Sequence, residues 1–264
     1  MTSIPPLSQT QPETFILESL SVDDESNQRM DGKVLYEVLR LQGKNPIYYY
    51  FRTQVELIKF ADVFRASGYR YLHLSCHGDE QVLQFTFGQT TYADFASIFE
   101  KKLNNRRLFI SGCSLGNEVF AQAVFEKSGG MYSVTAPTKK VFFSQTTSFW
   151  PAFYYMMHGW DTEAMKRARL WHVLERLTEI FEMPMAHYFK NTGKKSAIDY
   201  RLFGQTTVID ALVPAKKRNP RCTGRSGLTT PAARCPRLLI NALMQFSASR
   251  ISRMLRSTLT AYSH

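Results

Sequence analysis

Two residues that can carry out nucleophilic chemistry, His77 and Cys113, directly follow apolar, strand-like segments at residues 69–76 and 107–112. A cysteine reacts as its thiolate, and a neighbouring imidazole can take the thiol proton or stabilise the thiolate as an imidazolium. The two residue types therefore predict nucleophilic catalysis by Cys113 with the help of His77, if the fold brings their side chains together.

The spacing between the two segments supports that condition. About thirty residues containing one helical pattern separate them, and such a crossover usually returns to a neighbouring parallel strand, about 4.8 Å away. Open α/β sheets place ligands and chemistry at the carboxyl ends of their strands. We expect Gly78 and Gly112 to leave room for a substrate backbone. We also expect the N–H groups of Gly78 and Cys113 to form an oxyanion hole.

Strand and helix patterns alternate along the chain from residue 14 onward. Strands are predicted at residues 14–20, 47–51, 69–76, 107–112 and 132–136, with a short hairpin at 81–87 and late edge strands at 187–190 and 200–203. Helices are predicted at residues 32–41, 54–66, 92–103, 117–127, 147–157 and 161–180. This order predicts an α/β fold, a three-layer αβα sandwich around a mostly parallel sheet.

Composition divides the 264 residues into three parts. Residues 1–13 are polar and proline-rich and are predicted to be a flexible N-terminus, and residues 14–213 form the α/β domain. Ten of the 33 Lys and Arg residues lie after residue 213, where no Asp or Glu occurs, so the domain itself is nearly neutral. For the basic tail, residues 214–264, we weighed a nucleic-acid or membrane-surface arm, a partner-binding helix and a poorly ordered or aberrant extension, and we favour the last.

The remaining features place the chain in a broad class. Two of its four cysteines, Cys76 and Cys113, lie in apolar runs, and the spacing of all four matches neither a zinc pattern nor a disulfide framework. We see no signal peptide and no transmembrane segment, so the expected compartment is the cytoplasm. No metal and no cofactor is implied.

The segments around the two candidate residues resemble those of a known family, the caspase-like cysteine peptidases, and within it the CHAT-domain branch. The segments are LHLSCHG at residues 72–78 and ISGCSLG at residues 110–116, and the likeness extends over about residues 14–185. The resemblance implies a caspase-like fold and a thiol protease that hydrolyses peptide bonds, with His77 as general base and Cys113 as nucleophile, or an inactive relative. It implies a peptide or protein substrate and allows an activating protein partner. Gly112 and Ser114 depart from the usual motif, and no acidic residue precedes Cys113.

Two other functions remain open. Residues 112–116 also read G-x-S-x-G, the nucleophile elbow of an α/β-hydrolase such as an esterase or lipase, with Ser114 as nucleophile and Asp161 and His187 to complete a triad. A non-enzymatic interaction or signalling module is the second alternative, although the chain has no phosphate-binding glycine motif. A zinc site built from Cys76, His77 and Cys113 lacks a fourth ligand.

Overall fold

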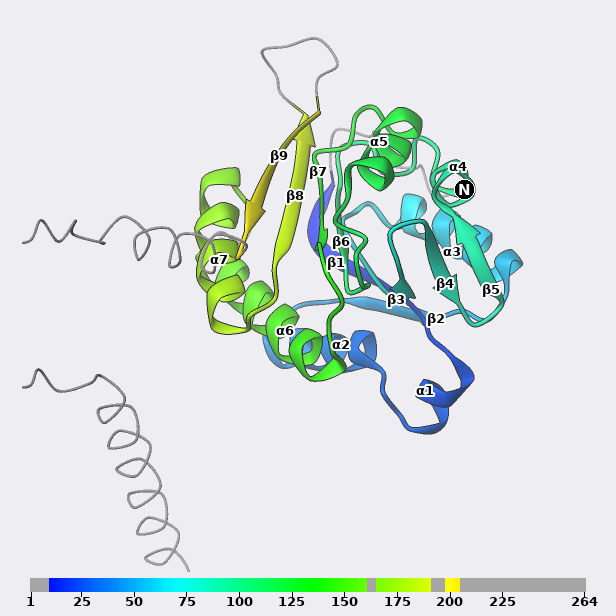
Figure 1. Ribbon diagram of the computed structural model, residues 1–264, viewed down its shortest axis with the longest axis horizontal. Coiled ribbons are helices and arrows are strands. Elements are labelled where there is room, and N and C mark those ends of the chain that lie inside the picture. Colours follow the sequence, from blue (N-terminus) through cyan, green and yellow to red (C-terminus); the bar gives the residue numbers. More distant parts are fainter. Residues whose placement is uncertain (1–9, 161–164, 191–197, 205–264) are drawn as a thin grey trace, which may run out of the picture. The chain divides into compact units, whose positions relative to one another are not determined.

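The computed structural model describes residues 10–160, 165–190 and 198–204 (Figure 1). The chain divides into two compact units, Met1–Lys217 and Arg218–His264. The described residues all belong to the first unit. The predicted basic tail and most of the predicted flexible N-terminus therefore lie outside the described residues, and both stay predictions.

A mixed sheet forms the centre of the first unit, with the strand order β2-β1-β3-β6-β7-β8-β9. Its strands are β1 Gln11–Ser19, β2 Ile47–Tyr50, β3 Tyr69–Gly78, β6 Arg107–Ile110, β7 Ser133–Pro137, β8 Met185–Lys190 and β9 Ile198–Phe203. All pairs from β2 to β7 are parallel, whereas β8 and β9 pair antiparallel at one edge. A short antiparallel hairpin, β4 Val82–Phe85 and β5 Gly88–Thr91, extends from the end of β3.

Helices cover both faces of this sheet, as Figure 1 shows. The helices of one layer are α3 Gln54–Ser67, α4 Tyr92–Ile98 and α5 Glu118–Lys127; those of the other are α2 Asp31–Leu41, α6 Phe143–Trp160 and α7 Arg167–Ile180. A five-residue helix, α1 Val22–Ser26, follows β1. The predicted three-layer αβα sandwich with a mostly parallel sheet is confirmed.

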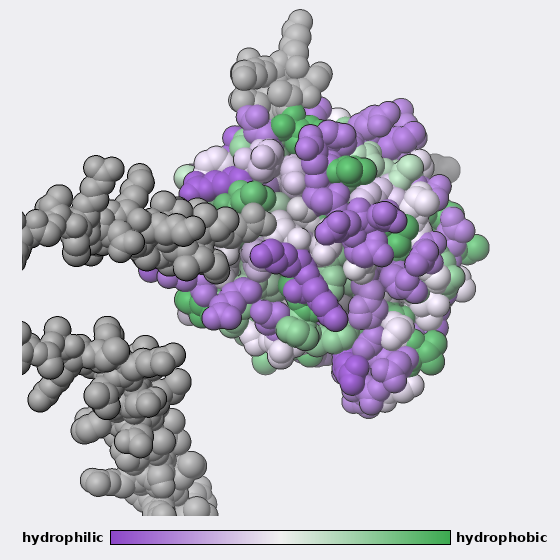
Figure 2. Space-filling model, viewed as in Figure 1, coloured by the Kyte–Doolittle hydropathy of each residue, from purple (hydrophilic) through white to green (hydrophobic). Residues whose placement is uncertain are grey.

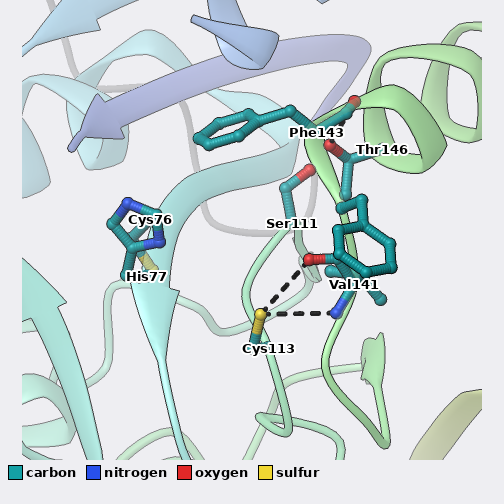
Figure 3. Close-up of a pocket in the computed structure, with 8 residues that line it drawn as sticks. Cys76, His77, Ser111, Cys113, Val141, Phe143 and Thr146 are labelled. Atoms are coloured by element: carbon teal, nitrogen blue, oxygen red, sulfur yellow. Dashed lines mark hydrogen bonds between the residues drawn. The ribbon is translucent and has the colours of Figure 1, made fainter. Parts of the chain in front are cut away.

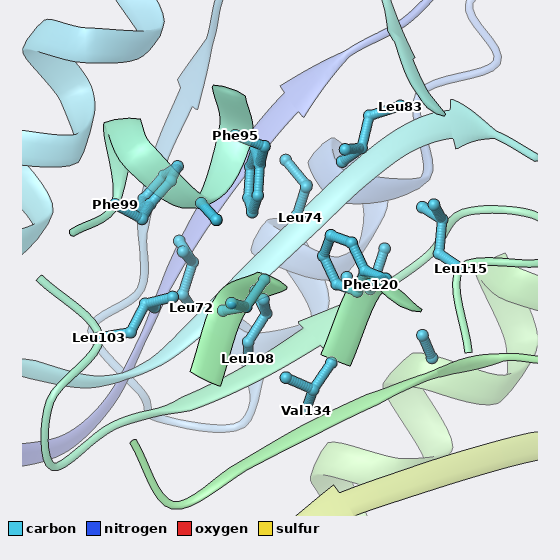
Figure 4. Close-up of a cluster of buried hydrophobic side chains, with 14 of the residues drawn as sticks. Leu72, Leu74, Leu83, Phe95, Phe99, Leu103, Leu108, Leu115, Phe120 and Val134 are labelled. Carbon is cyan, nitrogen blue, oxygen red and sulfur yellow. The ribbon is translucent and has the colours of Figure 1, made fainter. Parts of the chain in front are cut away.

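Each layer has its own buried core, because the strands are apolar on both faces. Leu72 and Leu74 of β3 and Leu108 of β6 pack with Phe95 and Phe120 from α4 and α5 (Figure 4). The opposite core is dominated by aromatic residues of α6, which pack on Tyr71 of β3 and Phe109 of β6; these residues are Phe149, Trp150, Phe153 and Tyr154. On the face seen in Figure 2, hydrophilic side chains are interspersed with hydrophobic ones.

The local sequence explains where several elements begin and end. Thr53 and Glu56 form a reciprocal capping box at the start of α3, and Gly68 ends that helix in a left-handed conformation with φ 72°. Strand β3 runs through His77 and Gly78, two residues further than expected, because both residues pair with β4. Helix α7 begins at Arg167, later than the expected residue 161, and residues 161–164 lie outside the described residues.

Candidate functional site

The two strands that carry His77 and Cys113 are direct neighbours. Strands β3 and β6 pair in parallel, with Leu74 opposite Ile110, so His77 and Cys113 each lie three residues beyond the same paired position. Both side chains line one small cavity at the carboxyl edge of the sheet (Figure 3). The predicted juxtaposition of the imidazole and the thiol at one edge of the sheet therefore occurs in the structure.

His77 is held by a carboxylate that the sequence alone did not reveal. Its Nε2 lies 2.6 Å from Oδ2 of Asp24, whose side chain is only 7% exposed. When Nε2 carries a proton it donates to Asp24, and Nδ1 is then the nitrogen free to accept a proton from a thiol. The pair therefore fixes both the orientation and the tautomer of the His77 ring.

Asp24 lies in α1, and its own contacts keep it charged. The N-cap residue Ser21 donates its hydroxyl to Asp24, and Arg29 lies 3.3 Å from the second carboxylate oxygen. Burial alone would raise the pKa of Asp24, but the hydrogen bonds from Ser21 and His77, the His77 charge and Arg29 together lower it below its usual value of 3.8. The acidic run in residues 22–26 shows no apolar periodicity, so nothing in the sequence singled out this one carboxylate.

Cys113 is positioned by the tight turn between β6 and α5. Ser114 adopts φ 55°, and its N–H donates to the carbonyl of Lys139 at 3.1 Å. Gly116 donates to Pro137 at 2.7 Å, and a Cβ on Gly116 would lie 2.4 Å from the carbonyl oxygen of Ala136. Glycine is required at 116 because the turn lies directly against the backbone of β7.

A segment between β7 and α6 lies against both candidate catalytic residues. The Cys113 Sγ is 3.4 Å from the N–H and 3.6 Å from the carbonyl oxygen of Val141, and the ring of Phe143 meets the His77 ring edge-on at 5.8 Å. We name residues 138–143, which run from the end of β7 to the first residue of α6, the strap. The cavity has a volume of about 30 Å³, room for a few water molecules at most, and Cys113 is partly exposed beside the strap.

The two glycines of the site have a different role from the one expected. A Cβ on Gly112 would lie 2.4 Å from Cδ1 of Leu115, and a Cβ on Gly78 would lie 2.9 Å from the same side chain. Leu115 is completely buried and fills the space that was expected to hold a substrate backbone. The oxyanion hole formed by the N–H groups of Gly78 and Cys113 stays a prediction.

The remaining predicted residues do not join this cluster. Cys76 lines the same cavity but is only 3% exposed and packs into the core under α4 and α5, and burial raises the pKa of its thiol well above the ordinary value. Neither Cys76, His77 and Cys113 nor any other group of three potential ligands among the described residues is arranged to hold a metal ion.

The α/β-hydrolase alternative gains no support from the arrangement. His187 lies in the middle of β8, fully buried, with Nδ1 2.8 Å from the hydroxyl of Thr135. Ser114 is not among the residues that line the cavity with His77, and Asp161 lies outside the described residues. The first two strands also pair in parallel, whereas that fold usually opens with an antiparallel hairpin.

Comparisons with known proteins find similarity in fold. No known family profile and no curated protein matches the sequence. An inactive zymogen of a C11 protease from Parabacteroides distasonis matches with a TM-score of 0.49 and 11% identity, over 71% of this chain and 63% of that one. The complex of the pro- and mature domains of Porphyromonas gingivalis RgpB matches with a TM-score of 0.44 and 14% identity, over 67% of this chain and 45% of that one.

The chain spans less than two thirds of the length of either structure, and the match concerns the fold alone. Among the residues that the structure describes, no helix is long and apolar enough to cross a membrane.

Proposed function

We propose that the chain is a cysteine peptidase in which Cys113 is the nucleophile, His77 the general base and Asp24 the carboxylate that orients His77. The observation that carries the proposal is the placement of His77 and Cys113 in one cavity with His77 Nε2 bound to Asp24 at 2.6 Å. A carboxylate that fixes the tautomer of a histidine beside a nucleophile is the general arrangement of acyl-transfer enzymes.

The chemistry follows from the roles of these groups. His77 Nδ1 takes the thiol proton, and the Cys113 thiolate attacks the carbonyl carbon of a peptide bond. The N–H groups of Gly78 and Cys113 would stabilise the oxyanion that forms. His77 then gives its proton to the departing amine, and a water molecule activated by His77 hydrolyses the thioester, which regenerates the thiol.

The strap determines when this chemistry is possible. In the described conformation the Cys113 thiol contacts the backbone N–H and carbonyl oxygen of Val141. Substrate binding has to replace both contacts. A peptide is an extended chain of N–H and carbonyl groups and can replace both contacts. An activating protein partner that moves the strap would have the same effect, and it remains part of the proposal.

Peptide cleavage tests the proposed activity. The full chain is incubated with a mixture of peptides of diverse sequence, and new termini are identified by mass spectrometry. Cleavage that disappears in Cys113→Ala and His77→Ala and persists in Ser114→Ala supports the proposal. Cleavage that survives in Cys113→Ala would assign the activity to other residues.

A further inference from the structure

Two carboxyl groups that the proposed chemistry does not use are buried beside the cavity. Glu18 of β1 is 0% exposed and Asp31, the first residue of α2, is 4% exposed. The hydroxyl of Ser75 lies between them, 3.0 Å from Glu18 Oε1 and hydrogen-bonded to Oδ1 of Asp31. One hydroxyl thus joins two acidic side chains from separate elements.

Glu18 has the surroundings of an ionised carboxylate. The backbone N–H groups of Gly32 and Lys33, in the first turn of α2, donate to it at 2.7 and 3.2 Å, and Tyr48 donates its hydroxyl at 2.8 Å. These groups are fixed donors at a helix N-terminus, which favours negative charge. A single negative charge shared by the pair is therefore well accommodated beside these donors.

Asp31 links the pair to both strands of the candidate site. The side chains of Ser111 and Thr146 act to lower its pKa, and both of these side chains line the cavity that contains Cys113 and His77. Ser111 stands two residues before Cys113, and Ser75 stands two residues before His77. The carboxyl pair therefore connects the ends of β3 and β6 from below the cavity.

Within the described part of the chain, no cation balances two negative charges at this place. The titratable groups that face the pair are Tyr48 from β2 and Cys76 from β3, and His73 contacts it through Ser111 at 3.2 Å. Burial lowers the pKa of His73 to about 3, so this histidine is neutral, and the Lys33 side chain is exposed to solvent. Among the described residues neither carboxyl forms an ion pair.

Two adjacent carboxyl groups without a cation cannot both ionise at low energetic cost. Burial raises the pKa of Asp31, and burial together with the charge of Asp31 raises that of Glu18 to about 7. The two groups titrate as a pair and hold one proton between them below that pH.

We infer that Glu18 and Asp31 share one proton and are positioning residues, which hold the ends of β3 and β6 at the spacing that His77 and Cys113 need. The inference that the pair shares a proton is supported by the contacts of Glu18 and Asp31 and does not depend on the proposed function. Only the purpose of the spacing rests on the proposed peptidase function.

The inference has a definite pH dependence. Between the ordinary glutamate value near 4.5 and about 7, the folded pair binds more protons than the unfolded chain. Stability contributed by the pair therefore falls as the pH rises through that range. Above it, two negative charges repel each other and the links through Ser75 and Ser111 loosen.

Asp31→Asn tests the inference, because asparagine has the same shape and stays neutral at every pH. Infrared spectra of the full chain report the carbonyl band of a protonated carboxylic acid. The rate at which iodoacetamide alkylates Cys113, followed by peptide mass mapping, reports the site. The matched control is Asp62→Asn in α3, whose side chain is 63% exposed.

We expect a buried carboxylic acid band in the wild-type chain that disappears as the pH rises past neutrality. In Asp31→Asn the band should disappear at a lower pH, because burial alone then raises the pKa of Glu18. The ratio of the Cys113 alkylation rate in the wild type to the rate in Asp31→Asn should be near one at about pH 6. This ratio should change several-fold by about pH 9. A missing band in the wild type, or a ratio that does not change with pH, would overturn the inference. If Asp31→Asn does not fold, Ser75→Ala replaces it. The Ser75 hydroxyl donates to the charged form of the pair, so its loss should raise the pH at which the carboxylic acid band disappears. A band that disappears at the same pH as in the wild type would equally overturn the inference.

Two peptidyl electrophiles, one with lysine and one with alanine next to the reactive group, separate positioning from substrate binding. A positioning role predicts that Asp31→Asn changes labelling by both probes equally. A loss confined to the lysine probe would show that the pair binds substrate, against the inference. If neither probe labels the wild type while the infrared band is present, the peptidase proposal fails and the shared proton stands.

Discussion

The two strand ends that form the candidate site are held in different ways. At the end of β3, the His77 ring is oriented by polar contacts, with Asp24 at 2.6 Å and Arg29 behind it. At the end of β6, Cys113 is placed by the close fit of a turn, in which Gly112 meets Leu115 and Gly116 meets the backbone of β7. The base should therefore be sensitive to charge and pH, whereas the nucleophile should be sensitive to added volume.

The largest expected effect is on the turn. Gly116→Ala places a Cβ 2.4 Å from the carbonyl oxygen of Ala136, so the backbone has to shift. We expect a loss of about 2–4 kcal/mol in the free energy of unfolding, measured with urea. The control is Gly159→Ala in α6, where a Cβ meets nothing within 4 Å and helix propensity predicts a gain of up to about 1 kcal/mol. Equal effects of the two substitutions would mean that the turn is not held by close backbone contact.

The second effect is on the base. Asp24→Asn keeps the shape of the side chain and removes the charge that orients His77, so labelling of Cys113 by a peptidyl electrophile should slow by about 100-fold with little change in fold. Asp23→Asn is the control, because Asp23 is the adjacent acid and its side chain is 76% exposed. Similar rates in the wild type and Asp24→Asn would remove Asp24 from the proposed mechanism.

The same carboxylate predicts a pH dependence of stability. The pKa of Asp24 is lowered in the folded chain, so its contribution is complete above the unfolded value of 3.8 and is lost as the pH falls through the folded value. Urea unfolding at several pH values should show a gap between the wild type and Asp24→Asn that narrows below about pH 4. A gap that stays constant down to about pH 2 would mean that the charge of Asp24 does not stabilise the fold.

The smallest expected effect concerns the strap. Phe143→Ala removes the edge-on contact with His77 and should raise the rate of Cys113 alkylation by a small thiol reagent about threefold. Tyr155→Ala in α6 is the control, since Tyr155 is 65% exposed and does not line the cavity. If the Tyr155 substitution accelerates alkylation as much as the Phe143 substitution does, the contact between Phe143 and His77 does not restrict access.

The sequence predicted the part of the site that depends on strand order. Apolar runs ending at His77 and Cys113, with one helix between them, were enough to place both residues at one edge of a parallel sheet. Late strands at residues 187–190 and 200–203 were also predicted and correspond to β8 and β9, but only β9 lies at the edge, because β8 pairs with both β7 and β9.

Features that depend on tertiary contacts were missed. Asp24 lies on a short helix in an acidic segment where periodicity gives no signal, and its importance comes only from its distance to His77. The close contact of Leu115 with Gly78 and Gly112 depends on how a turn folds back on two strands. Glu18 did carry a signal, since a charged residue inside an apolar strand has to find buried partners.

Labelling of the purified full chain by a peptidyl acyloxymethyl ketone, with the modified residue mapped by mass spectrometry, tests the central claim most directly. A serine-directed fluorophosphonate is applied in parallel, and both probes are repeated on Cys113→Ala, His77→Ala and Ser114→Ala. The account predicts a ketone adduct on Cys113 that requires His77 and does not require Ser114, with no fluorophosphonate adduct. A fluorophosphonate adduct on Ser114, or ketone labelling that persists in Cys113→Ala, would contradict it.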